Sequence, residues 1–246
     1  EILINLVTSS QEEVELHELL DKLKTLELEG QIVGFIHTID DSLADAIKVD
    51  KLDLIYGRDY IIEEILGLKF KISPFSFFQT NTFGAEKLYS IVRDFAGDTK
   101  DNIIFDLYSG TGTIAQIMAP VAKKVVGIEI VEEAVEIARE NAKLNSLDNC
   151  EFIAGDVLQE VDKLKEKPDL IILDPPREGI NPKALGKIID FNPKRFVYVS
   201  CNPVTLVRDL KGFIDRGYSI EKVKCMDMFP QTSHVETVVL LSRVDK

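Results

Sequence analysis

One cysteine of this chain stands where a protein would place a nucleophile. Cys201 follows the apolar run Phe196–Val199 and precedes an Asn-Pro pair, the residue types that cap and begin a helix. A cysteine at the start of a helix lies in positive local potential, which favours the nucleophilic thiolate. We therefore expect Cys201 to be a nucleophile, whereas Cys150 and Cys225 fit the common role of small buried residues.

A thiolate is needed when carbon 5 of uracil must be made nucleophilic. Addition of sulfur to carbon 6 places electron density on carbon 5, and the adduct must later lose its carbon-5 proton to a base. The candidate bases are Glu236, at the start of the last apolar run, and His234 just before it. The residues alone do not choose between the two.

A second candidate group is Asp174-Pro-Pro-Arg177, which ends another apolar run. The prolines stiffen the loop and remove amide donors, so Asp174 is held at the strand end, where it could accept a hydrogen bond from the imide N–H of a flipped base. An aromatic residue after the prolines would favour methylation of an exocyclic amine. Arg177 stands there instead, and we expect it to bind substrate.

A glycine-rich turn with acidic strand ends predicts a cofactor site. Asp106 precedes a turn containing Gly110 and Gly112, and the next two strands end at Glu129 and Asp156. Glu129 could accept from ribose hydroxyls and Asp156 from an adenine amino group. The turn also fits the G-x-G-x-x-A pattern of a nicotinamide dinucleotide site. Asp106 favours S-adenosylmethionine, because a carboxylate suits its positively charged methionine end and repels a pyrophosphate.

The elements that must position these residues alternate regularly from about residue 81. Apolar strands alternate with amphipathic helices, which predicts an α/β fold with a mostly parallel sheet covered on both faces and an antiparallel edge formed by the last two strands. Residues 1–70 predict a small α/β domain, with a helix capped by Ser10 and Glu13. The other domain spans residues 71–246.

Composition sets limits on function. The 246 residues carry a net charge of −13, which on its own argues for a small-molecule enzyme, since RNA-binding proteins usually present a basic face. The three cysteines form no C-x-x-C pair, so we expect a reducing compartment, no metal cluster and no metal ligands. We expect no membrane segment. Because the chain starts at Glu1, we also expect it to be part of a longer protein.

Five motifs in order carry a resemblance: F-F-Q-T-N, D-L-Y-S-G-T-G-T, D-P-P-R, S-C-N-P and D-M-F-P-Q-T-S-H-V-E. The chain resembles the RNA 5-methyluridine methyltransferases, over residues 70–246 strongly and over 1–70 as the family's central domain. The resemblance implies a Rossmann-like, seven-stranded methyltransferase sheet. It also implies that Cys201 is the nucleophile, that Glu236 is the base and that His234 only supports them.

By the same resemblance, a further set of residues contacts the cofactor S-adenosylmethionine. This set comprises Gln79, Tyr108, Gly110, Gly112, Thr113, Glu129, Asp156 and Asp174. Gln79 and Asp174 are also expected to touch the uracil. From the residues alone, the aromatic run before Gln79 could equally be a hydrophobic seam.

The resemblance implies an RNA partner and a cytoplasmic enzyme. We expect 23S ribosomal RNA as the substrate, with the T-loop of transfer RNA as the alternative. The chain departs from the family at Ser109, where many relatives carry cysteine, and it has neither the usual N-terminal β-barrel nor the four-cysteine cluster of some members. Other functions weighed were a nicotinamide oxidoreductase, a cytosine-C5 methyltransferase and a non-catalytic RNA-binding module.

Overall fold

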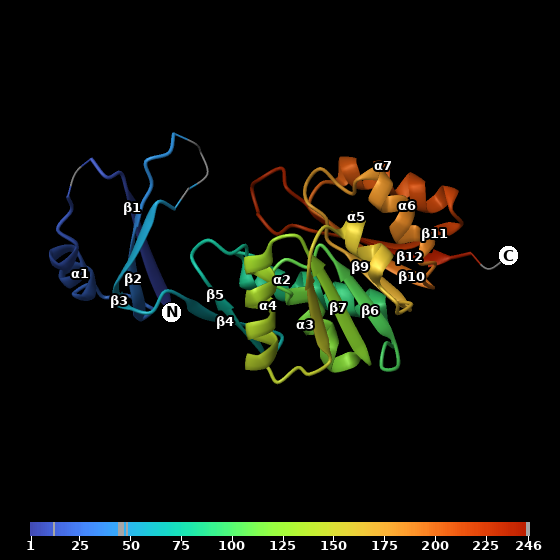
Figure 1. The fold of residues 1–246 in the computed structure, drawn as a ribbon, viewed down its shortest axis with the longest axis horizontal. Coiled ribbons are helices and arrows are strands. Elements are labelled where there is room, and N and C mark those ends of the chain that lie inside the picture. The colour runs from blue at the N-terminus through green and yellow to red at the C-terminus, as the bar shows by residue number, and fades with distance from the viewer. Residues whose placement is uncertain (12, 44–46, 48, 245–246) are drawn as a thin grey trace. The chain divides into compact units, whose positions relative to one another are not determined.

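The chain divides into two compact units. A computed structural model describes residues 1–11, 13–43, 47 and 49–244. One unit comprises residues 1–63 and 71–76, and the other comprises residues 64–70 and 77–246 (Figure 1). The boundary that the sequence predicts, at residue 70, lies within this interleaved stretch.

The described part of the first unit contains a three-stranded sheet and one helix. Strand β1 pairs in parallel with β2, and β2 pairs antiparallel with β3. Their bounds are β1 (Ile2–Thr8), α1 (Leu16–Lys24), β2 (Ile32–Ile39) and β3 (Lys51–Gly57). Strand β2 is rich in β-branched residues and buries Phe35 and Ile36, as expected of a central strand.

The helix start predicted at Ser10 and Glu13 is wrong. Helix α1 begins at Leu16, after Glu15, which makes no side-chain cap. The backbone N–H of Ser10 instead donates to Asp41 Oδ1 at 2.7 Å. A tertiary acceptor thus satisfies the group that a local capping box would have used.

The second unit is built on a seven-stranded sheet in the order β11-β12-β10-β9-β6-β7-β8. Strands β8, β7, β6, β9 and β10 run parallel, and β12 pairs antiparallel with both β10 and β11. The predicted α/β class, parallel sheet and antiparallel edge are confirmed. The strand bounds are β6 (Ile103–Leu107), β7 (Lys124–Glu129), β8 (Cys150–Ala154), β9 (Leu170–Leu173), β10 (Arg195–Ser200), β11 (Tyr218–Met226) and β12 (Glu236–Arg243).

Helices cover both faces of this sheet, and each face has its own apolar core. One face packs against α2, α3 and α4, and the other against α5, α6 and α7, as Figure 1 shows for α4 and for the orange α6 and α7. The bounds are α2 (Thr82–Ala96), α3 (Thr113–Met118), α4 (Glu132–Leu144), α5 (Val157–Glu160), α6 (Pro182–Asp190) and α7 (Pro203–Asp215). Helix α2 ends at Gly97, whose φ of 66° few other residues tolerate.

A hairpin that the sequence analysis did not predict lies ahead of Gln79. Strands β4 (Ile61–Ile65) and β5 (Leu68–Ile72) are joined by Leu66 and Gly67, both at positive φ. The Asn145 amide binds the backbone N–H and C=O of Lys69, both at 2.8 Å. Residues 64–70 are thereby fixed to the second unit. No helix in the part of the chain that the structure describes is long and apolar enough to cross a membrane.

Candidate active site

The antiparallel pair β10–β12 brings Cys201 opposite Glu236. The ladder pairs Ser200 with Thr237, and the next residue along each direction is Cys201 on one side and Glu236 on the other. Directly opposed residues on antiparallel strands have Cβ atoms about 4.5–5.5 Å apart. Cys201 is half-buried, and Glu236 is 6% exposed. The structure therefore brings together the residues predicted to be nucleophile and base.

Asp174 joins this pair from the neighbouring strand. Strand β9 pairs in parallel with β10, and Asp174 is the first residue beyond its end. The negative charge of Glu236 raises the pKa of Asp174, and both carboxylates raise the pKa of Cys201. One sulfur and two carboxyl groups thus meet at the carboxyl edge of the sheet, where ligands bind in open α/β folds.

The protonation of this cluster differs from the expectation for Cys201. Burial raises the pKa of its thiol, and the charges of Glu236 and Asp174 raise it further, outweighing the lowering by its own backbone N–H and by Arg177. The expectation that local positive potential keeps this sulfur ionised is wrong, because two carboxylates face it. Burial and the charge of Glu236 raise the pKa of Asp174 to about 7, and burial raises the pKa of Glu236.

Two loops meet beside Cys201. Asn202 accepts from the N–H of Val204 at 3.1 Å and so caps α7, as predicted. The structure places the His234 ring Nδ1 3.1 Å from a terminal nitrogen of the Arg177 guanidinium. His234 therefore links the loop before β12 to the loop after β9.

The segment around Gln79 is tied to the loop that leads to Glu236. Asn81 accepts from the N–H of Gly84 at 2.9 Å, which caps α2, and its amide donates to the carbonyl of Met228 at 2.9 Å. A Cβ on Gly84 would lie 2.5 Å from the Met228 sulfur, so the two segments fit without spare room. Gln79 is half-buried.

The aromatic run before Gln79 divides between two environments. Phe78 packs against Phe70 with ring centroids 5.8 Å apart and joins the apolar core as a hydrophobic seam. Phe77 is 76% exposed. Cys225, expected to be a buried residue, is exposed on β11, because that strand forms the edge of the sheet; Cys150 is half-buried.

At the glycine-rich turn, Asp106 is fully buried yet incompletely bonded. Its Oδ2 accepts from the N–H of Ala115 at 2.9 Å, and its Oδ1 has no partner among the described residues. Burial, followed by the charge of Asp174, raises the pKa of Asp106 well above its usual range. An unpaired buried acceptor is costly unless a ligand completes it, so a cationic group at this turn would fit.

The turn itself is shaped by positive backbone angles. Gly110 has φ 53° and Gly112 has φ 73°, and a Cβ on Gly112 would lie 2.5 Å from the Phe152 ring. Tyr108 also has positive φ, at 67°, and burial, with the charge of Asp156 next, raises its pKa to about 12. Strain of this kind in a non-glycine residue is typical of functional sites.

The remaining predicted cofactor residues surround this turn. Glu129 accepts from the N–H of Gly110 at 2.9 Å and from that of Val131 at 3.0 Å. Thr113 is buried at the start of α3, and Asp156 caps α5 by accepting from Leu158. The ends of three adjacent strands thus present carboxylates around two glycines, which suits an adenosyl group joined to a cationic methionine.

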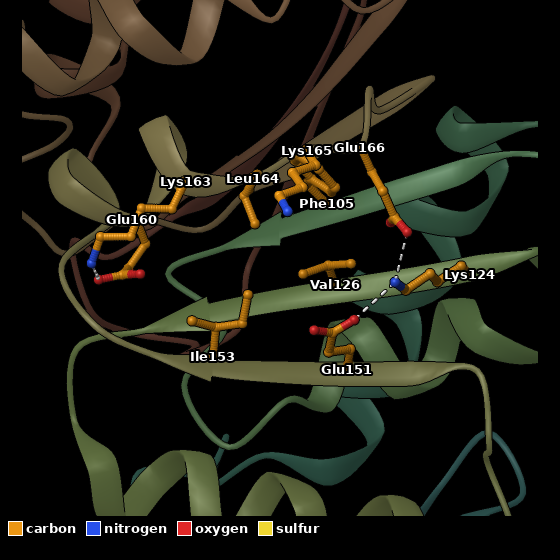
Figure 2. A pocket seen from close by; sticks show the side chains of 10 residues that line it. All are labelled: Phe105, Lys124, Val126, Glu151, Ile153, Glu160, Lys163, Leu164, Lys165 and Glu166. Carbon is orange, nitrogen blue, oxygen red and sulfur yellow. Dashed lines mark hydrogen bonds and ion pairs between the residues drawn. The ribbon is translucent and has the colours of Figure 1, made fainter.

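A separate hollow of about 260 Å³ lies beside β7 and β8 (Figure 2). Lys124 on its wall pairs with Glu151 at 2.8 Å and Glu166 at 2.9 Å, and Lys163 pairs with Glu160. Its described lining includes none of the predicted site residues. Over the described ranges, no group of three or more His, Cys, Asp or Glu side chains could hold a metal ion.

Comparison with known sequences gives one family and several relatives. A family model described as tRNA (Uracil-5-)-methyltransferase matches residues 11–244. An "Uncharacterized RNA methyltransferase" of Clostridium tetani is 64% identical over 245 residues, covering 100% of this chain and 54% of the relative. A protein of the same description from Caldanaerobacter subterraneus is 56% identical, covering 99% of this chain and 54% of the relative. The chain spans about half the length of the curated relatives it matches.

Solved structures agree with these sequence relatives. The Pyrococcus abyssi tRNA (uracil-54, C5)-methyltransferase, in complex with S-adenosyl-L-homocysteine, superposes with a TM-score of 0.80 at 30% identity. That match covers 98% of this chain and 56% of the other. M. jannaschii TYW2 in complex with AdoMet gives a TM-score of 0.56 at 20% identity, covers 78% of this chain and 91% of the other, and supports the fold alone.

Proposed function

The chain belongs to the tRNA (uracil-5-)-methyltransferase family, and from this premise we propose that it methylates carbon 5 of a uridine in RNA, using S-adenosylmethionine. The observation that carries the proposal is the placement of Cys201 opposite Glu236, with Asp174 beside them. A sulfur nucleophile facing a carboxylate base is the arrangement that substitution at uracil carbon 5 requires.

The proposed chemistry uses each of these groups once. The Cys201 sulfur, as the thiolate, bonds to carbon 6, and the electron pair of the C5=C6 bond moves toward the carbonyl oxygen on carbon 4. S-adenosylmethionine, when bound, supplies the methyl group that carbon 5 takes up. Glu236 then removes the carbon-5 proton, the C5=C6 bond re-forms, and the C6–S bond breaks to return the thiolate. Asp174 accepts a hydrogen bond from the uracil imide and so orients the ring.

The raised pKa values suit this sequence of proton movements. Burial keeps Glu236 a stronger base than a solvated carboxylate, because its ionised form is poorly solvated. The same carboxylates hold the Cys201 thiol in its protonated form, so the resting nucleophile is protected from unwanted alkylation. After each turnover, the proton that Glu236 accepts passes to solvent.

The cofactor is assigned to the glycine-rich turn and its neighbours. Asp106 offers its unpaired Oδ1 toward the cationic end of the cofactor, and Glu129 offers its carboxylate to the ribose. Asp156 is assigned to the adenine. Further contacts come from Gln79, Tyr108, Gly110, Gly112, Thr113 and Asp174.

We favour 23S ribosomal RNA as the substrate, and transfer RNA is the second candidate. The second is favoured by the likeness to the P. abyssi enzyme, whose name specifies uracil 54 of tRNA. In either RNA the target base must leave its stack before carbon 6 is reachable, which costs a few kcal/mol. We place Arg177, exposed beside Cys201, against the RNA around the flipped base.

Tritium release tests this proposal directly. RNA transcripts carrying uridine labelled with tritium at carbon 5 should release label only in the presence of S-adenosylmethionine, and either 23S rRNA or tRNA should be preferred. Cys201→Ser should abolish release, whereas the matched change Cys225→Ser on the exposed edge strand should not. Release from cytidine-labelled RNA alone, or equal release by Cys201→Ser, would contradict the assignment. Calorimetric binding of NAD in place of S-adenosylmethionine would favour the oxidoreductase alternative.

A further inference from the structure

Helix α7 grips the backbone of the loop that carries Arg177. The Arg177 carbonyl accepts from Asn202 Nδ2 at 3.1 Å and from Thr205 Oγ1 at 3.2 Å. Arg208 donates from one guanidinium nitrogen to the carbonyl of Glu178 at 2.8 Å. These donors lie on successive turns of one helix face and bind three backbone groups of one short loop.

A buried carboxylate completes the grip. Asp209 is 2% exposed, and its Oδ2 accepts from the backbone N–H of Ile180 and from the Tyr198 hydroxyl, both at 2.8 Å. Its Oδ1 accepts from Arg208 Nε at 2.8 Å. Asp209 therefore connects the substrate loop, α7 and strand β10 through one side chain, and the cost of burying its charge is offset by these donors.

The loop lies against this pair without free space. Gly179 has φ 77°, and a Cβ at this position would lie 2.5 Å from a guanidinium nitrogen of Arg208 and 2.6 Å from Asp209 Oδ2. Any other residue would push the loop away from the helix. The path of residues 177–180 is thus set by contact with α7.

The same helix begins two residues after Cys201. We propose that Asp209 and Arg208 are positioning residues that hold Asp174 and Arg177 in register with the Cys201 sulfur. This inference rests on the proposed function, because it assigns these residues to the alignment of a uracil ring between Cys201 and Asp174. Neither residue touches the reacting atoms.

The test compares variants that loosen the loop with variants that leave it in place. Asp209→Asn and Arg208→Lys weaken the grip, and the latter is partly exposed, so that the folded protein is retained. Tyr198→Phe removes a buried hydrogen bond from the same carboxylate without touching the loop. Asp215→Asn, on the exposed end of α7, is the surface control.

The measurements are kcat and KM for methylation, the rate of covalent adduct formation with 5-fluorouridine RNA, S-adenosylmethionine affinity by calorimetry, and Tm. Asp209→Asn and Arg208→Lys should lower kcat and the adduct rate by about 10- to 100-fold, as expected for a reacting group displaced by about an ångström, with cofactor affinity unchanged. Tyr198→Phe should lower Tm but leave kcat near that of the parent.

The outcomes separate the two claims. An adduct rate of Asp209→Asn and Arg208→Lys equal to that of the parent would overturn the positioning role and leave the proposed function standing. Loss of kcat in all buried variants in proportion to Tm would also overturn it. Absence of any adduct with the parent protein, while Cys201 reacts normally with iodoacetamide, would overturn the proposed function itself.

Discussion

Replacing Asp174 with Asn is expected to stabilise the folded protein at high pH. Burial and the charge of Glu236 raise the pKa of Asp174 from 3.8 to about 7, so ionisation of this side chain opposes folding. One pH unit of such a difference corresponds to about 1.36 kcal/mol, which makes the full effect about 4 kcal/mol. The side chain keeps some contact with water, so we expect between about 2 and 4 kcal/mol.

The sign of the pH dependence follows from the two pKa values. Below about pH 4 the carboxyl group is protonated in both the folded and the unfolded protein, and Asp174→Asn should have little effect. Between about pH 4 and pH 7 only the unfolded protein releases this proton, so the parent's free energy of unfolding falls relative to that of the variant. Above about pH 7 the difference should be constant and at its maximum.

Urea unfolding at about pH 5 and about pH 8 measures this difference. The variant should gain stability over the parent between the two conditions while losing methylation, because an amide accepts a weaker hydrogen bond from the uracil imide than a carboxylate does. Asp215→Asn, exposed on α7, should show no such gain. A difference between parent and Asp174→Asn that is the same at both pH values would refute the reasoning.

Two further predictions concern the turn and the nucleophile. Gly112→Ala should lower the free energy of unfolding by about 2–4 kcal/mol, because φ 73° and a ring 2.5 Å from the new Cβ act together, whereas Gly110→Ala, with open space around it, should cost only about 1 kcal/mol; urea unfolding compares them, and equal losses would contradict the packing argument. Glu236→Gln should lower the pKa of the Cys201 thiol by removing a facing negative charge, so its alkylation by iodoacetamide at neutral pH should be faster, with Cys225 as the internal reference, and an unchanged rate measured by mass spectrometry would contradict the electrostatic account.

The parts of the fold that follow from periodicity were predictable. Strand β9 matches its predicted span of residues 170–173, and α2 carries the predicted buried face and ends at Gly97. The hairpin β4–β5 was missed because it is short and its turn, at Leu66, places a bulky residue at positive φ. The capping box at Ser10 failed because a tertiary partner, Asp41, takes its place.

The candidate site shows a similar division. Strand-end positions of Cys201, Glu236 and Asp174 could be read from apolar runs, and sheet topology then places them together. The electrostatics at Cys201 could not, because they depend on carboxylates distant in sequence. Asp209 was missed, although its signal was present: a charged residue stands at a core position of α7, in the apolar spacing that includes Leu210.

The central claim is that Cys201 bonds to the uridine and that Glu236 releases it. Peptide mass spectrometry of Glu236→Gln, incubated with RNA and S-adenosylmethionine labelled in its methyl group, tests both halves at once. The account predicts that the methylated nucleotide stays bonded to the Cys201 peptide, because the carbon-5 proton is not removed. Labelled RNA released with no nucleotide on Cys201, or a nucleotide bonded to Cys150 or Cys225, would contradict it.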